Sequence, residues 1–315
     1  MSWLQERLFD QNAHIPRFAF QGTVFWMRAL SILCESDNFK NENIKNFYDT
    51  VQRRTPDQSA DTIAYECIFM ALHHLASLKE MMKVQCKYSI VRSGIITWYY
   101  SIYYASKSMI SAQGSSDPQT HASAAKIFQS ELIQRNKIIS PFSFSISDIT
   151  AESVEQKVSD LRGQNTYDLN KMPLNTQMAL GAAISYLKGT AKYQQLDREA
   201  RIRQFSDFKQ LNVENFRTKA ARVIRDNDLR QCSVNFLVQA FRYRGKANYR
   251  DVLYLSYGRD STSIIDRYIL DMIEVAEKYI MMASVFVSKR TERGTWNTFV
   301  NDINENALFE LPIDL

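Results

Sequence analysis

The chain has 315 residues, of which 45% are apolar, enough for one large domain or two ordinary ones with substantial cores. Only 9 glycines and 6 prolines accompany 16 tyrosines and 18 phenylalanines, which excludes collagen-like, linker-rich and turn-dense all-β architectures and disfavours glycine-dependent nucleotide sites. The formal net charge of +5 permits an anionic partner without demonstrating one. We therefore expect an all-α protein.

Apolar residues at helical spacing predict helices over 21–36 and 41–54, followed by a long helix that Asp57 or Ser59 caps. The four cysteines lie far apart and form no C-x-x-C pair, so we expect reduced structural thiols. The N-terminal residues do not resemble a secretory signal, and no stretch approaches the roughly 18 apolar residues of a membrane span. These features predict a cytoplasmic protein with no membrane partner, no metal and no cofactor.

A further helix is expected over residues 88–113, with Gly114 as the residue that ends it. Asp117 and Pro118 match an N-cap followed by proline at the first helical position, which predicts a helix over 118–136. The chain then changes its pattern. Apolar residues alternate with serines over 138–149, and this period of two predicts one short strand or extended segment.

The remainder of the chain again predicts helices, with a loop-like stretch over 164–174. Residues 196–230 form a charged region that holds nine basic and six acidic side chains. The last twenty-five or so residues are expected to pack back as a short helix and a tail. The predicted helices in this half are 150–162, 175–188, 231–257 and 262–290.

Histidine-based chemistry is tightly limited because the chain has only 4 histidines. P-loop, dinucleotide-fingerprint, H-E-x-x-H and G-x-S-x-G motifs are all absent. His73 and His74 are adjacent on a helix and point about 100° apart, so they cannot both bind one metal without a break in the helix. His121 is expected in the first turn of its helix, either as a capping-region residue or as part of a site.

Two segments carry the candidate site residues. In residues 87–128 one helical stripe is expected in the core, and other residues could line a polar groove. The stripe comprises Ile95, Tyr99, Ile102, Ser106 and Met109, and the groove candidates are Arg92, Tyr100, Tyr103, Tyr104 and Lys107. The second segment, residues 241–251, holds Arg242, Arg244, Lys246 and Arg250 together with Tyr243, Asn248 and Tyr249. Arginine side chains can bind phosphate through paired hydrogen bonds, and aromatic rings can stack on bases. The alternative is that this cluster is only a solvated helix face.

In this order, the two segments resemble the HEPN superfamily, and the layout is similar to the YaaC-like family. The matching residues are Tyr103-Tyr104-Ala105-Ser106-Lys107, Gly114, Thr120-His121 with Ile127-Phe128, Arg244 with Ala247-Asn248-Tyr249, and Ala276 through Val287. The resemblance implies an up-and-down helical bundle. Its expected parts are an N-terminal helical extension (1–56), two bundle halves (57–136 and 231–290), a mostly helical, charged insertion (137–230) and a C-terminal tail (291–315).

Catalytic HEPN proteins are metal-independent ribonucleases whose motif has four to six residues between an arginine and a histidine. Here Arg242 leads to Asn248, and no histidine follows His121. The resemblance therefore predicts a module that binds RNA (tRNA or mRNA) or a protein partner encoded nearby. It further implies a homodimer or larger oligomer in a bacterial stress, toxin–antitoxin or antiphage defence system.

Two alternatives stay open: a ribonuclease with a rearranged site, and a structural scaffold subunit. In the rearranged site His121 would transfer the proton and Arg242 or Arg244 would contact the phosphate. Asn248 and Tyr249 would lie beside them, to orient and to stack or hydrogen-bond. The phosphate-binding candidates are Arg242, Arg244, Lys246, Arg250, Arg92 and Lys107.

Overall fold

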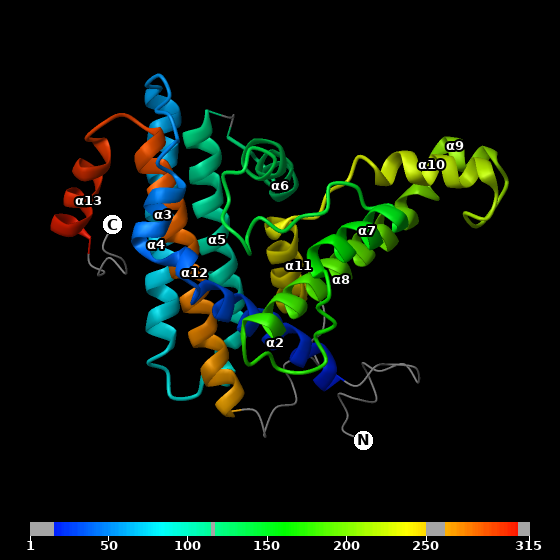
Figure 1. Ribbon diagram of the computed structural model, residues 1–315, viewed down its shortest axis with the longest axis horizontal. Coiled ribbons are helices and arrows are strands. Elements are labelled where there is room, and N and C mark those ends of the chain that lie inside the picture. The colour runs from blue at the N-terminus through cyan, green and yellow to red at the C-terminus, as the bar shows by residue number, and fades with distance from the viewer. Residues whose placement is uncertain (1–15, 115–116, 250–261, 308–315) are drawn as a thin grey trace.

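The computed structural model describes residues 16–114, 117–249 and 262–307, which fold into helices and form no strand (Figure 1). The predicted all-α class is therefore confirmed. The α-helices are α2 (Pro16–Cys34), α3 (Asn41–Phe47), α4 (Gln58–Met81), α5 (Val91–Gln113), α6 (His121–Ile127), α7 (Ala151–Arg162), α8 (Thr176–Ile202), α9 (Ser206–Gln210), α10 (Lys219–Leu229), α11 (Phe236–Tyr249), α12 (Thr262–Arg290) and α13 (Thr295–Asn306).

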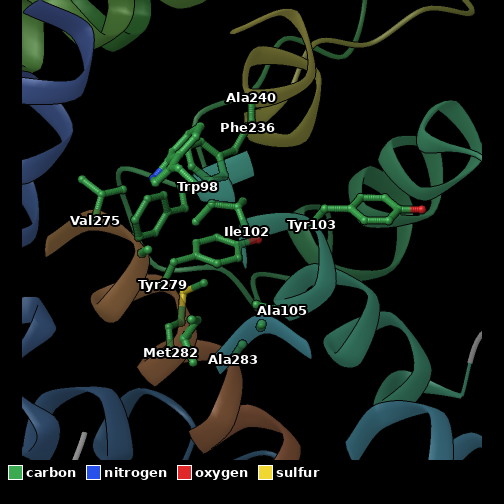
Figure 2. Close-up of a cluster of buried hydrophobic side chains, with 14 of the residues drawn as sticks. Trp98, Ile102, Tyr103, Ala105, Phe236, Ala240, Val275, Tyr279, Met282 and Ala283 are labelled. Carbon is green, nitrogen blue, oxygen red and sulfur yellow. The ribbon is translucent and has the colours of Figure 1, made fainter. Parts of the chain in front are cut away.

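Three long helices, α4, α5 and α12, lie side by side and form the main bundle, while α11 packs on α5 (Figure 1). Helix α2 crosses the bundle and contacts both α8 and α12. The main core is rich in aromatic rings, and Figure 2 shows Trp98 of α5, Phe236 of α11 and Tyr279 of α12 within it. All three side chains are at most 1% exposed.

This main core draws residues from each of the five segments expected from the sequence. Phe39, Trp98, Tyr186, Phe236 and Ile303 come from the five segments in chain order, and all belong to the same cluster. The division into extension, bundle halves, insertion and tail stays a prediction, but the segments share one hydrophobic core.

Local capping residues set several helix ends as predicted. The Asp57 carboxylate accepts a hydrogen bond from the backbone N–H of Ala60 and caps α4. Gly114 ends α5 in the left-handed conformation with φ of 93°, which glycine adopts without the steric cost of a side chain. Helix α12 begins and ends at the predicted residues.

Other boundaries differ from the prediction. The helix expected over 118–136 begins only at His121, because Thr120 and Ser123 cap each other's backbone N–H groups there. It continues as a π-helix over Phe128–Ile133. Helix α3 is shorter than expected, α8 extends to Ile202, and α11 begins at Phe236. The end of the predicted helix 231–257 lies outside the described residues.

The segment predicted to be extended makes a single antiparallel bridge in place of a strand. Ile146 and Val234 exchange two backbone hydrogen bonds of 2.8 Å. Phe142 and Ile146 are buried, whereas Phe144 is half-buried. The alternation therefore marks which side chains enter the core, without a neighbouring strand to extend the pairing.

The end of α8 together with α9 and α10 projects from the bundle, and we call this region, residues 196–230, the arm (Figure 1). Its own core consists of Ile202, Phe208 and Ala221 with partly buried neighbours. The four cysteines are free thiols. None of the helices in the described part of the chain is long and apolar enough to cross a membrane.

Candidate functional site around His121

His121 is the first residue of α6, held there by the Thr120 cap, and its half-buried imidazole faces α5 and α11. Its Nδ1 lies 2.6 Å from the hydroxyl oxygen of Tyr99 in α5. Its Nε2 lies 3.5 Å from a guanidinium nitrogen of Arg244 in α11. Tertiary packing thus joins residues that are 22 and 123 positions from His121 in the chain.

Aromatic rings surround this imidazole on several sides. The ring centroids of Tyr103 and Phe241 lie 4.6 and 5.0 Å from that of His121. Figure 2 shows that Tyr103 leaves α5 on the side away from the Tyr279 cluster. Phe241 is 42% exposed, so this group of rings reaches the surface. We call His121, Tyr99, Tyr100, Tyr103, Phe241 and Arg244 the His121 cluster.

The guanidinium of Arg244 lies over three rings of this cluster. Its central carbon is 5.4 Å from the ring centroids of Tyr99 and Tyr100, and 5.6 Å from that of Phe241. Cation–π attraction is stronger in such desolvated surroundings, and Arg244 is only 9% exposed. The rings therefore hold a permanent positive charge beside the imidazole.

These surroundings decide the protonation of His121. Burial, and then the charge of Arg244, lower its pKa below the ordinary value of 6.5. Arginine can only donate, so Nε2 accepts from Arg244 and the proton of the neutral ring sits on Nδ1, which donates to Tyr99. Burial raises the pKa of Tyr99, so the phenol stays protonated. At neutral pH His121 is therefore an uncharged imidazole whose unprotonated Nε2 makes only the long contact with Arg244.

Lys107 lies one turn beyond Tyr103 on α5, and it is already paired with an anion. Its ammonium group lies 2.8 Å from a carboxylate oxygen of Asp117. Burial by itself lowers the pKa of Lys107, but the hydrogen bond to Asp117 and the neighbouring Cys67 give a net upward shift. Lys107 therefore stays charged, and a phosphate would have to compete with Asp117 for it.

Arg242 faces a different part of the molecule from Arg244, because two helical residues are separated by about 200° around the axis. Its guanidinium donates to the Thr190 hydroxyl at 3.0 Å and lies over the ring of Tyr193 at 4.8 Å. Both partners belong to α8. Of the two arginines proposed as partners for His121, the structure brings Arg244 to it and turns Arg242 toward α8.

The remaining predicted residues are not brought to His121 by any described contact. Arg92 lies near the beginning of α5, two turns before Tyr99, and its buried Nε has no hydrogen-bond partner among the described residues. Lys246, Asn248 and Tyr249 belong to α11, but their side chains are outside the described part of the structure. Arg250 also lies outside the described residues.

Helical spacing in the sequence predicts Tyr99 in the core stripe and predicts no role for Phe241. Tyr99 is indeed 1% exposed, yet its hydroxyl reaches His121. The available clue was register, since Tyr99 and Tyr103 are one turn apart on α5, as are Phe241 and Arg244 on α11. On the neighbouring α4, His74 stacks on Tyr100 and Tyr104 at 5.6 and 5.7 Å, which extends the aromatic surface.

Among the described residues, no three His, Cys, Asp or Glu side chains gather closely enough to hold a metal ion. No family model, curated protein or solved structure matches this chain. The chemistry of the His121 cluster therefore rests on its own geometry.

Proposed function

We propose that this chain is a HEPN-like module that binds RNA, with the His121 cluster as a contact site for one exposed base and its adjoining phosphate. The observation that carries the proposal is the convergence of Arg244, His121 and at least three aromatic rings from three helices. Aromatic faces accept any base by stacking, and an arginine fork binds a phosphate through parallel hydrogen bonds.

The roles within the site follow from exposure. Phe241 is accessible enough to stack against an unpaired base. The long contact between Arg244 and His121 is weak at 3.5 Å, so a phosphate oxygen can replace the imidazole as acceptor with little loss. Recognition of this kind favours single-stranded RNA, in which bases are free to leave the stack.

The test measures the affinity of the purified protein for a labelled 12-nucleotide single-stranded RNA by fluorescence anisotropy at low salt. Phe241→Ala is expected to weaken binding about 5- to 100-fold, as the loss of one stacked base does. Phe47→Ala is the matched control, because Phe47 is 41% exposed on α3 and outside the cluster. Equal affinities for the wild type and the Phe241 variant, or no RNA binding by the intact protein, would overturn the proposal.

A second candidate function is metal-independent RNA cleavage, favoured by the neutral His121 beside Arg244. His121 would take the proton of a ribose 2′-hydroxyl, whose oxygen would attack phosphorus while the 5′-oxygen leaves. The imidazolium would return its proton to the leaving oxygen, giving a 2′,3′-cyclic phosphate and a 5′-hydroxyl. Arg244 would stabilise the charge that develops on the phosphate oxygens.

Incubation with tRNA and total RNA in EDTA tests this chemistry. The proposed cleavage should leave cyclic-phosphate ends, and it should be lost in His121→Gln and kept in His73→Gln. His73 is the control because it is exposed on α4. Equal cleavage by the two variants, or none by the wild type, would exclude His121 as the catalytic group.

The setting of this RNA binding remains part of the proposal, and it derives from the HEPN resemblance alone. We infer a bacterial stress, toxin–antitoxin or antiphage defence system, a homodimer, and a cytoplasmic location. Light scattering on dilute protein tests the dimer, and a monomer would contradict it. If the intact protein retains no RNA, a protein partner or a scaffold role becomes the better hypothesis.

A further inference from the structure

The arm carries a disproportionate share of the protein's positive charge. With nine basic and six acidic residues in 196–230, its net charge is +3, against +5 for the whole chain. Four of the six acids are neutralised inside the arm by three arginines. These ion pairs are Asp197–Arg201, Asp228–Arg198, Glu199–Arg225 and Asp226–Arg225.

The remaining cations face solvent. Six of the exposed basic side chains of the arm form no ion pair with a carboxylate in the described part of the chain. We call them the arm cations: Arg203, Lys209, Arg217, Lys219, Arg222 and Arg230. The two acids left over, Asp207 and Glu214, cannot balance them.

The arm fold also holds some of these cations in place. The guanidinium of Arg203 lies 5.1 Å from the ring centroid of Phe216, which Arg225 approaches to 5.7 Å from α10. Lys219 and Arg222 are one turn apart at the beginning of α10, where positive charge opposes the helix dipole and lowers stability. Packing of the arm therefore accounts for Arg203 but gives no reason for the charges of Lys219 and Arg222.

We propose that the arm is a second RNA-contacting surface, which binds the phosphate backbone without reading sequence. This inference rests on the proposed function and extends it, because it adds an electrostatic contact apart from the His121 cluster. Four of the six arm cations are arginines, whose planar forks fit phosphate oxygens. Phe205, 40% exposed beside them, offers a ring for stacking.

The test compares the triple variant Arg217→Gln, Lys219→Gln, Arg222→Gln with a matched control, Lys45→Gln, Lys171→Gln, Arg293→Gln. Both remove three exposed charges, and the control charges lie outside the arm. The probe is a labelled 30-nucleotide single-stranded RNA over a series of salt concentrations. Each phosphate contact on a single strand contributes about 0.7 to the slope of log affinity against log salt. The arm variant should therefore lower that slope by about 2 and the affinity at 100 mM salt by about tenfold or more.

The outcomes separate this inference from the function on which it rests. If the wild type binds RNA, Phe241→Ala weakens binding and the arm variant behaves like its control, the arm inference is wrong and the His121 proposal stands. If the wild type retains no RNA, both are wrong. If the arm variant keeps its RNA affinity but loses binding to phosphatidylserine vesicles, the surface serves a lipid and the RNA assignment is overturned.

Discussion

The central bundle and the arm bury their helices to very different degrees. In the bundle, α4, α5 and α12 share a continuous core in which rings such as Trp98 and Tyr279 are fully enclosed. In the arm, three buried residues close the core of two short helices and the end of α8. The side chains of the bundle must therefore fit a packed core. Many side chains of the arm face solvent, do not have to fit a core, and carry charge.

Removal of a large ring from the bundle should have the largest effect. Trp98→Ala is expected to lower the free energy of unfolding by about 3–5 kcal/mol, because an enclosed side chain is replaced by a cavity. Urea denaturation followed by circular dichroism measures it. Trp296→Ala on α13, where the indole is half-buried, should cost clearly less. Equal losses would contradict the contrast between enclosed and peripheral rings.

The corresponding change in the arm should act locally. Phe208→Ala removes the largest buried residue of the arm core, at a cost of about 3 kcal/mol to the arm's own stability. We expect hydrogen exchange to accelerate across residues 196–230 while protection in α5 is unchanged. Loss of protection in both regions would show that the arm and the bundle unfold together.

Helix α8 connects the two regions. Two of its glycines differ in their surroundings, because Gly181 is closely packed and Gly189 lies in open space. An alanine Cβ at Gly181 would lie 2.6 Å from the Tyr167 carbonyl oxygen, so Gly181→Ala should destabilise by about 1–3 kcal/mol. At Gly189 nothing lies within 4 Å, and Gly189→Ala should stabilise by about 0.5–1 kcal/mol through helix propensity. Thermal unfolding of the two variants tests both signs. A stabilised Gly181→Ala variant would contradict the close packing at Gly181, and a destabilised Gly189→Ala variant would contradict the open space at Gly189.

The smallest expected effect is a change in one pKa. Arg244→Gln should raise the pKa of His121 toward 6.5, since the arginine charge disfavours the imidazolium, and Arg242→Gln on the other face of α11 should leave it unchanged. NMR titration of the imidazole signals measures both.

The same shift has a consequence for stability. A folded-state pKa below 6.5 means that the unfolded chain binds more protons, so His121 favours folding fully at high pH and less as pH falls through 6.5. The wild type should therefore lose more stability than Arg244→Gln between pH 7.5 and pH 5.5. An equal loss of stability in the two proteins would show that Arg244 does not lower the pKa of His121.

Local features of the sequence predicted much of the fold. The Asp57 cap, the glycine after α5 and the limits of α12 depend on residues within a turn of one another. The start of α6 was misplaced because two capping sequences compete within four residues, and Thr120 with Ser123 satisfies more backbone groups than Asp117. The added length of α8 was missed because its last turns carry charge in place of an apolar stripe.

The candidate site was predicted only in part. His121 and Arg244 were singled out, but so was Arg242, and sequence spacing alone could not separate the two arginines. Tyr99 was assigned to the core, which its burial supports, while its hydroxyl serves the site. A side chain can belong to both when its ring is enclosed and only its polar end reaches a partner.

Composition, helical periodicity and capping residues determined that this protein is all-α, and they located most of its helices, because these depend on interactions within a few residues. Only the tertiary structure decided which faces of α5, α6 and α11 meet, and hence that Arg244 rather than Arg242 stands beside His121. It likewise decided that three arginines of the arm neutralise four of its six acids while six other cations remain at the surface, unpaired with any described carboxylate. The contact between Arg244 and His121 and the ion pairs Arg198–Asp228 and Arg225–Glu199 join residues distant in the chain, and packing of whole helices selects them.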